Sequence, residues 1–200
     1  MQIITRPAKL RDVDAIIPFI KMASGGLSEF LLGDIIADVS PDTFIEMALT
    51  DENTTYHYHY MMVAESDHKI IAAANYYPAE LHGLPDIMRS FIAKEKLEII
   101  QPYLDSRVDG SMYINTLAVD EAYQNTACGL ILGKRIEQVA REKHHWCLSA
   151  HVWVENTVLY QNMLKSGFKE VEHVSVEHPS LQYQGGMVLL RSPSFATVMT

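Results

Sequence analysis

The sequence predicts an α+β fold built around one mixed β-sheet. Two observations indicate it. The first is the order of the expected elements, in which strands and helices are interleaved along the whole chain and neither type forms one block. The second is size and composition: 200 residues, 48% hydrophobic and 20% charged, suit a single domain with a buried core. We expect that domain over residues 1–192, with a helical insertion at 79–104 and a tail at 193–200.

The first elements are a short strand and two helices. Residues 3–5 form the strand. Asp12 opens a helix whose apolar residues recur at helical spacing, and a Ser-Gly-Gly turn at 24–26 ends it. Ser40 and Pro41 supply an N-cap and a first-turn proline for the second helix.

Residues 60–65 and 69–77 then read as a hairpin joined by the turn at 66–68. Just before it, His57 and His59 alternate with tyrosines, which predicts a strand that carries both imidazoles on one face. We interpret these histidines as solvated rather than as metal ligands, because no Cys or Asp supports them at a suitable spacing.

A third helix is expected from Pro85 to about Pro102, and its apolar face comprises Ile87, Met88, Phe91 and Ile92. The remaining elements alternate more regularly. They are strands at 111–119, 146–154, 168–176 and 187–191, and helices at 130–143 and 156–166.

Charge and cysteine content exclude several classes of function. The chain has 16 Lys and Arg against 25 Asp and Glu, a formal charge of −9, which argues against binding nucleic acid or an anionic membrane. Two cysteines are too few for a disulfide scaffold. With no leader-like or membrane-spanning apolar stretch in the sequence, we expect a cytoplasmic protein.

The most informative segment is a strand, a tight turn and a helix. Leu117, Ala118 and Val119 end the strand, and residues 124–129 form the turn. Turns of this kind point several backbone N–H groups at one place beside a helix N-terminus, which suits a phosphate or pyrophosphate. Residues 122–136 contain two basic residues and no acidic one, so the local charge does not oppose an anion.

These residues resemble the GNAT superfamily of acetyl-CoA-dependent N-acetyltransferases. The match is Leu-Ala-Val at 117–119 with Tyr-Gln-x-x-Ala-x-Gly at 123–129, together with a second block at 156–168 that ends in Lys-Ser-Gly-Phe. The resemblance implies a three-layer fold whose central sheet is mixed and mostly antiparallel, flanked by helices, and it implies acetyl-CoA as acetyl donor without a metal. The residues it assigns to CoA are Leu117, Ala118, Val119, Gln124, Asn125, Thr126, Ala127, Cys128, Gly129 and Asn156.

The chain departs from the family pattern at three places. Ala127 stands where the family turn usually has glycine, so a methyl group faces the expected pyrophosphate. Met163 stands where many members carry a tyrosine that protonates the departing thiolate; Tyr160 lies three residues earlier and is the candidate replacement. Tyr113 and Asn115 occupy the strand where the family keeps a basic Glu or His, and we expect them to line the acceptor pocket or hold a water.

We therefore expect an enzyme that acetylates a primary amine, on a small molecule or a protein, in a ternary complex. The alternative is a CoA-binding regulatory or interaction module without turnover, which Ala127 and Met163 favour. The insertion at 79–104 is longer than the family connection, and we expect its helix to cover the acceptor pocket or to build a homodimer contact.

The net charge is concentrated in one region. Residues 22–68 contain nine acids and no Lys or Arg, and the rest of the chain balances at 16 acids and 16 bases. This region includes the helices that the resemblance places beside the acceptor. It could be an ordinary solvated surface, or it could attract a cationic amine.

If it attracts the acceptor, neutralising Asp34, Asp38 and Asp42 together should raise the acceptor KM at low salt, because long-range attraction is lost. Steady-state kinetics at two salt concentrations measure this effect. The affinity for acetyl-CoA serves as the control and should not change. An unaltered acceptor KM would contradict electrostatic attraction.

Overall fold

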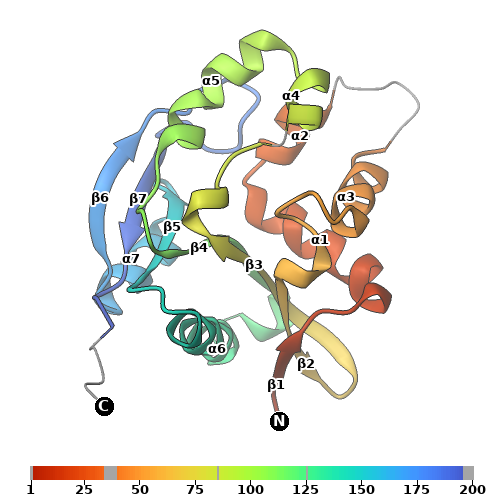
Figure 1. The fold of residues 1–200 in the computed structure, drawn as a ribbon, viewed down its shortest axis with the longest axis vertical. Coiled ribbons are helices and arrows are strands. Elements are labelled where there is room, and N and C mark those ends of the chain that lie inside the picture. The colour runs from red at the N-terminus through yellow and green to blue at the C-terminus, as the bar shows by residue number, and fades with distance from the viewer. Residues whose placement is uncertain (1, 34–39, 85, 125, 196–200) are drawn as a thin grey trace.

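A seven-stranded sheet forms the centre of the computed structural model, which describes residues 2–33, 40–84, 86–124 and 126–195 (Figure 1). Its strands are β1 (Ile4–Pro7), β2 (Met61–Ser66), β3 (Lys69–Pro78), β4 (Met112–Val119), β5 (Leu148–Trp153), β6 (Lys169–Val174) and β7 (Met187–Arg191). They lie in the order β1-β2-β3-β4-β5-β7-β6. All neighbours run antiparallel except β4 and β5, which are parallel. The predicted fold class, a mixed and mostly antiparallel sheet in an α+β protein, is confirmed.

Helices cover both faces of this sheet. They are α1 (Val13–Ser24), α2 (Leu27–Leu32), α3 (Pro41–Thr50), α4 (Asp86–Phe91), α5 (Lys94–Asp105), α6 (Cys128–Glu142) and α7 (Thr157–Lys165). Alternate residues of β2 separate the layers, as the twofold period of a strand requires: Met61 and Val63 join the core under α1 and α3, whereas Met62 and Ala64 join the core under α6. Figure 1 shows α1 and α3 on the opposite side of β3 and β4 from α6.

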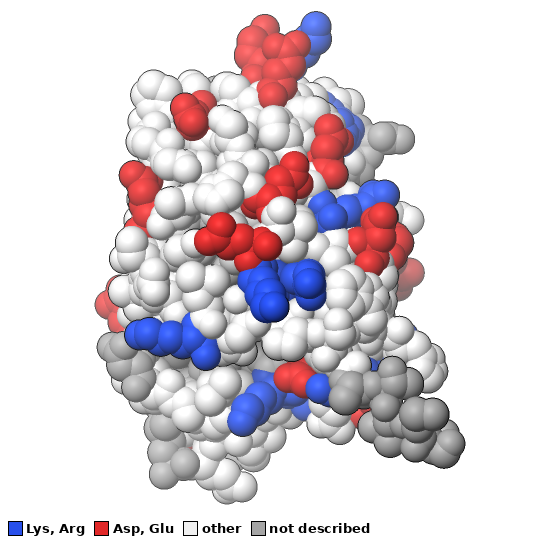
Figure 2. Space-filling model, turned by 90° about the vertical axis from the view of Figure 1, so that its left-hand side faces the viewer, with Lys and Arg blue, Asp and Glu red and all other residues white. Residues whose placement is uncertain are grey.

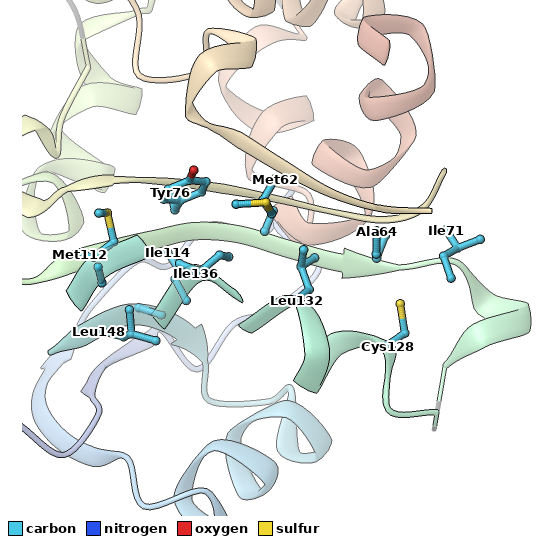
Figure 3. Close-up of a cluster of buried hydrophobic side chains, with 14 residues drawn as sticks. Met62, Ala64, Ile71, Tyr76, Met112, Ile114, Cys128, Leu132, Ile136 and Leu148 are labelled. Carbon is cyan, nitrogen blue, oxygen red and sulfur yellow. The ribbon is translucent and has the colours of Figure 1, made fainter. Parts of the chain in front are cut away.

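The core between α6 and the sheet is the larger apolar cluster. In Figure 3, Leu132 and Ile136 of α6 point at side chains of the strands, among them Met62 and Ile114. Leu132, Ile136 and Met62 have no exposed surface. This packing fixes the position of the α6 N-terminus relative to the end of β4.

The sequence predicted most of these elements. Ser40 caps α3 by accepting a hydrogen bond from the Thr43 amide at 3.1 Å. The β2–β3 turn places Asp67 and His68 in the left-handed region, with φ of 49° and 64°, as a two-residue hairpin requires. The helix and strand of the strand–turn–helix segment and the final strand also lie where they were predicted.

The prediction of a single helix between Pro85 and Pro102 is wrong. Ala93 adopts an extended backbone, with φ −56° and ψ 140°, and divides the segment into α4 and α5. Helix α5 then continues past Pro102 to Asp105. As a consequence Phe91, expected on a buried face, is 53% exposed.

The strand expected around His57 and His59 is also wrong. Tyr58–Tyr60 form one turn of 3-10 helix, closed by a hydrogen bond from the Tyr60 amide to the His57 carbonyl at 2.8 Å. The rings of His57 and His59 contact each other, with centroids 4.4 Å apart, and His57 is buried rather than solvated. The short helix α2 was not predicted.

The described end of the chain stays on the body of the fold. The Phe195 amide donates to the Trp146 carbonyl at 2.8 Å, and the Arg141 guanidinium lies 4.3 Å from the Phe195 ring centroid. The first residues of the expected tail are therefore packed.

Two leucines of α6 test the core assignment. Leu132→Ala should lower the free energy of unfolding by about 2–5 kcal/mol, because it removes buried methyl groups and leaves a cavity. Leu130→Ala on the same helix is the matched control: Leu130 is 56% exposed, and its replacement should change stability by only about 0.5 kcal/mol. Urea denaturation measures both, and equal losses would contradict the assignment.

Candidate active site

Strands β4 and β5 separate after two paired positions. The parallel ladder joins Met112 to Leu148 and Tyr113 to Ser149 and extends no further. Strand β4 nevertheless continues to Val119, paired with β3 on its other side. An opening therefore forms between β4 and β5. One of its edges is β4, which stays paired with β3 on its other side.

A bulge lies at the point of separation. Thr116 pairs with Asn75 of β3 and Ile114 pairs with Tyr76, so Asn115 is the extra residue on β4. The Asn75 amide donates to the Thr116 hydroxyl at 3.3 Å, which replaces a regular ladder bond. The bulge turns Asn115 into the opening.

Beyond the bulge, the backbone of β4 turns polar groups that β3 does not pair towards the opening. The Asp120 amide donates to the Ile71 carbonyl of β3 at 2.9 Å. Because backbone groups alternate in direction along a strand, those of Leu117 and Val119 face away from β3. The side-chain amide of Gln124 reaches the Val119 carbonyl at 3.3 Å from this open side.

The turn after β4 presents amides at the start of α6. The Thr126 hydroxyl accepts a hydrogen bond from the Cys128 amide at 3.2 Å and so caps the helix. Within the part of the chain that the structure describes, the amides of Ala127, Gly129 and Leu130 have no hydrogen-bond acceptor. Unpaired amides at a helix N-terminus are suited to an anion.

The turn accommodates both Ala127 and Cys128. Ala127 has φ −70°, so its methyl group costs no left-handed strain. Cys128 is fully buried and burial raises the pKa of its thiol, in keeping with a structural residue. Asn125, the remaining turn residue assigned to CoA, lies outside the described residues.

A cavity of about 110 Å³ lies beside the separated strands. Its walls come from β4 and β5, from α1 and α2, from the start of α7 and from α5. They comprise Ile20, Ala23, Ser24, Leu27, Ser28, Leu31, Tyr56, Tyr103, Tyr113, Asn115, Thr116, His151, Val152, Trp153, Asn156, Leu159 and Met187. No Asp, Glu, Lys or Arg is among the described residues that line it.

The structure brings Tyr113 and Asn115 together in this cavity. The Tyr103 hydroxyl donates to Asn115 Oδ1 at 3.0 Å, and Asn115 Nδ2 donates to Asn75 Oδ1 at 3.1 Å. Tyr103 belongs to α5, so the 79–104 insertion supplies a wall of the cavity.

Sequence reasoning missed a third polar residue, His151 of β5. Its Nδ1 lies 2.9 Å from the Tyr113 hydroxyl, and its Nε2 lies 3.1 Å from the Ser106 hydroxyl. Ser106 in turn donates to Glu172 Oε2 of β6 at 2.9 Å. One ionisable residue in the otherwise uncharged strand Leu148–Trp153 was the available signal.

Burial keeps these groups uncharged near neutral pH. Desolvation, with a smaller effect of His82, lowers the pKa of His151 to about 3. Desolvation also raises the pKa of Tyr103 and of Tyr113 above the usual value. The cavity therefore presents neutral hydroxyl, amide and imidazole groups.

Tyr160, the candidate acid, lies elsewhere. Its hydroxyl donates to Glu170 of β6, which raises the pKa of Tyr160, and it is not among the residues that line the cavity. Met163 packs between two apolar clusters. Asn156 does line the cavity, and it caps α7 through the Leu159 amide at 3.3 Å.

The acidic region is only partly described. Asp42 pairs with Lys21 at 2.6 Å, whereas Asp34 and Asp38 lie outside the described residues. On the face that carries β6 and α7, acidic and basic side chains are interspersed (Figure 2). The elements from residues 22–68 lie on the other side of the molecule (Figure 1).

Among the described residues, no three His, Cys, Asp or Glu side chains gather where they could hold a metal ion. None of the helices in the described ranges is both long enough and apolar enough to cross a membrane.

Solved structures resemble this fold along nearly its whole length. An N-acetyltransferase from Staphylococcus aureus Mu50 is 16% identical with a TM-score of 0.67, over 94% of this chain and 99% of that one. A GCN5-related N-acetyltransferase from Kribbella flavida is 16% identical with a TM-score of 0.60, over 96% and 97%. The PaiA N-acetyltransferase of Thermoplasma acidophilum, solved in complex with coenzyme A, is 13% identical with a TM-score of 0.53, over 96% and 99%.

No model of a known protein family matches the sequence, and no curated protein sequence matches it. The structural likeness carries the assignment, with α1 to α3 and α5 on one face of a seven-stranded mixed sheet and α6 and α7 on the other. The chain has the fold of the GNAT superfamily of N-acetyltransferases.

Proposed function

We propose that this protein is an N-acetyltransferase that transfers the acetyl group of acetyl-CoA to a primary amine. The observation that carries the proposal is the opening between β4 and β5. Along β4, the cavity wall at Asn115 and Thr116 is followed directly by backbone groups of Leu117 and Val119 that face the opening, and the turn then leads to the amides at the start of α6. The coenzyme A complex of PaiA supports the choice of donor.

The residues present fit CoA. The backbone of Leu117 and Val119 faces the opening and would pair with the amide groups of the pantetheine arm. The amides of Ala127, Gly129 and Leu130 would hold the pyrophosphate at the positive end of α6. When bound, acetyl-CoA supplies the acetyl group as an activated thioester.

The chain itself contributes position and polarity to the reaction. An N–H group near Val119 would stabilise the oxyanion that forms when the amine attacks. Tyr113 and Asn115 would orient the amine in the cavity, and holding both reactants in line supplies much of the rate. Attack is direct, so no residue forms a covalent intermediate.

The polarity of the cavity bears on the protonation state in which the expected cationic acceptor binds. In solution the amine is protonated, and the acidic region at 22–68 would attract it. The cavity holds no carboxylate to balance that charge among its described walls, so it favours the neutral, nucleophilic amine. We infer that the acceptor loses its proton as it binds.

The remaining partners and compartment stay part of this proposal. Cys128 and Cys147 are both free and buried, which fits a reducing cytoplasm. A homodimer through the insertion stays a prediction.

Titration calorimetry with acetyl-CoA, together with thiol release measured over a panel of amines, tests the proposed function. Binding followed by thiol release with at least one amine is expected. Binding without release on any amine would instead favour a regulatory CoA-binding module, for which the apolar Met163 at the family acid position speaks. Failure to bind acetyl-CoA would contradict both.

Two glycines of α6 test the phosphate site. A Cβ at Gly129 would lie 3.5 Å from Val119 and 3.8 Å from Leu117, beside the strand end. Gly129→Asp should weaken acetyl-CoA binding about tenfold or more, because a carboxylate there repels the pyrophosphate while suiting the helix dipole.

Gly133→Asp is the matched control, since it adds the same charge one turn further along, where a Cβ meets nothing within 4 Å. It should weaken binding much less. Calorimetry measures both dissociation constants, and equal values would show that the start of α6 does not hold the phosphates.

A further inference from the structure

A line of hydrogen bonds leads from the cavity along one face of the sheet, past the end of α5, to the molecular surface. It runs from Tyr113 of β4 to His151 of β5 at 2.9 Å, and from His151 to Ser106 after α5 at 3.1 Å. Ser106 then contacts Glu172 of β6 at 2.9 Å. Tyr113 and His151 line the cavity, whereas Glu172 is exposed. Residues of β4, β5, β6 and the segment after α5 thus meet in one chain of polar atoms.

The carboxylate at the end fixes the direction of every bond. An ionised carboxylate only accepts, so the Ser106 hydroxyl donates to Glu172. The Ser106 oxygen is then free to accept from His151 Nε2–H, which leaves His151 Nδ1 to accept from the Tyr113 hydroxyl. The other contact of that hydroxyl, with Tyr103 at 3.4 Å, is long for an O–H···O bond. All donors therefore point from the cavity to the surface.

We propose that Tyr113, His151, Ser106 and Glu172 form a relay that carries the acceptor's amine proton out of the cavity. The proposal rests on the proposed acetyl transfer. As the amine nitrogen gives its proton to the Tyr113 oxygen, the Tyr113 proton passes to His151 Nδ1, the His151 Nε2 proton to Ser106 and the Ser106 proton to Glu172. One proton moves in total, from the amine to the carboxylate and on to water, and His151 changes tautomer.

Burial requires the transfer to be concerted. Desolvation lowers the pKa of His151 to about 3, so an imidazolium would not persist there. The raised pKa of buried Tyr113 likewise excludes a lasting tyrosinate. A concerted shift avoids both ions, since every buried group stays neutral throughout.

A second histidine in the same cluster, His82, is bonded to a tyrosine but has no onward path for a proton. The Tyr77 hydroxyl lies 3.3 Å from His82 Nδ1, and His82 Nε2 lies 3.0 Å from the Tyr103 carbonyl. A carbonyl accepts a hydrogen bond but cannot pass a proton on. Tyr77–His82 is therefore a structural copy of the first half of the relay without its exit, and it provides a control.

The kinetic test uses variants of the links that lie outside the cavity. Ser106→Ala should lower kcat about tenfold or more, within the range of general-base effects, and Ser106→Thr, which keeps the hydroxyl, should restore it. Glu172→Gln should also lower kcat, because an amide accepts the hydrogen bond but not the proton. Glu177→Gln is the matched control: Glu177 also accepts from a serine, Ser175, on the surface beyond β6, and its loss should not change kcat.

Comparing a protonated with a neutral acceptor amine distinguishes a proton relay from a purely structural role. Phenethylamine is largely protonated at neutral pH and aniline is not, so Ser106→Ala and Glu172→Gln should reduce transfer to phenethylamine more than to aniline. The dissociation constant of acetyl-CoA should remain within about twofold of the wild-type value. Wild-type kcat in both variants, or equal losses with both amines, would overturn the relay. Tyr77→Phe should leave transfer unchanged, whereas Tyr113→Phe should lower it.

A measurement on the resting protein tests the relay without an acceptor. Nitrogen-15 NMR of His151, assigned by comparison with His151→Gln, should show the neutral Nε2–H tautomer between about pH 5 and pH 9. The titratable groups that face this ring are Tyr103, Tyr113, His82 and, across Ser106, Glu172. The Nδ1–H tautomer or a protonated ring would overturn the relay.

The two measurements separate the two proposals. Transfer with wild-type kinetics in Ser106→Ala leaves the acetyltransferase intact and removes the relay. No transfer to any amine, with His151 in the Nε2–H form, overturns the proposed function and with it the use of the relay, although the hydrogen-bond chain itself is then present.

Discussion

The separation of β4 and β5 is the constraint on which the rest of this site depends. Two paired positions hold the strands together, and beyond them β4 keeps its partner on one side only. Backbone groups on the other side must find a different partner, because buried unpaired amides and carbonyls are costly. Beside the separated strands lies the cavity, which Asn115 and Thr116 of β4 and His151 of β5 help to line. One break in a ladder thus provides a strand edge for a ligand and a cavity beside it.

The polarity of the cavity follows from what surrounds it. Tyr103, Tyr113 and His151 are each enclosed by other rings, and removing them from water disfavours every charged form. Charge is instead kept outside, at surface carboxylates such as Glu172 and in the acidic segment at 22–68. A cationic amine and a neutral cavity are compatible only if a proton can leave. In the proposed relay, hydrogen bonds along one face of the sheet meet this requirement, and no base inside the cavity is needed.

The sequence predicted the parts of the fold that local patterns encode. The strand ending at Val119, the turn and α6 are marked in the sequence by hydrophobic periodicity and by turn residues. These local signals were enough to place them. The break at Ala93 was missed because nothing in the sequence of the segment forbids a continuous helix. For the site, Tyr113 and Asn115 were predicted from the family position and from their spacing on one strand; both line the cavity, and their role stays a prediction. The link from His151 to Ser106 and on to Glu172 spans 45 and then 66 residues, and no local pattern reports such contacts.

The departures from the family pattern are consistent with the chemistry of the two protons involved. Met163 removes the usual donor to the departing thiolate, and Tyr160 is engaged with Glu170. A thiol has a pKa of about 8.5 and an alkylammonium one of about 10.4, so near neutral pH a thiolate leaves without much help whereas an amine retains its proton. Losing an acid therefore costs such an enzyme less than losing a path for the amine proton. Under the proposed function, this chain lacks the acid, which matters less near pH 7, and keeps a path for the amine proton, which matters more.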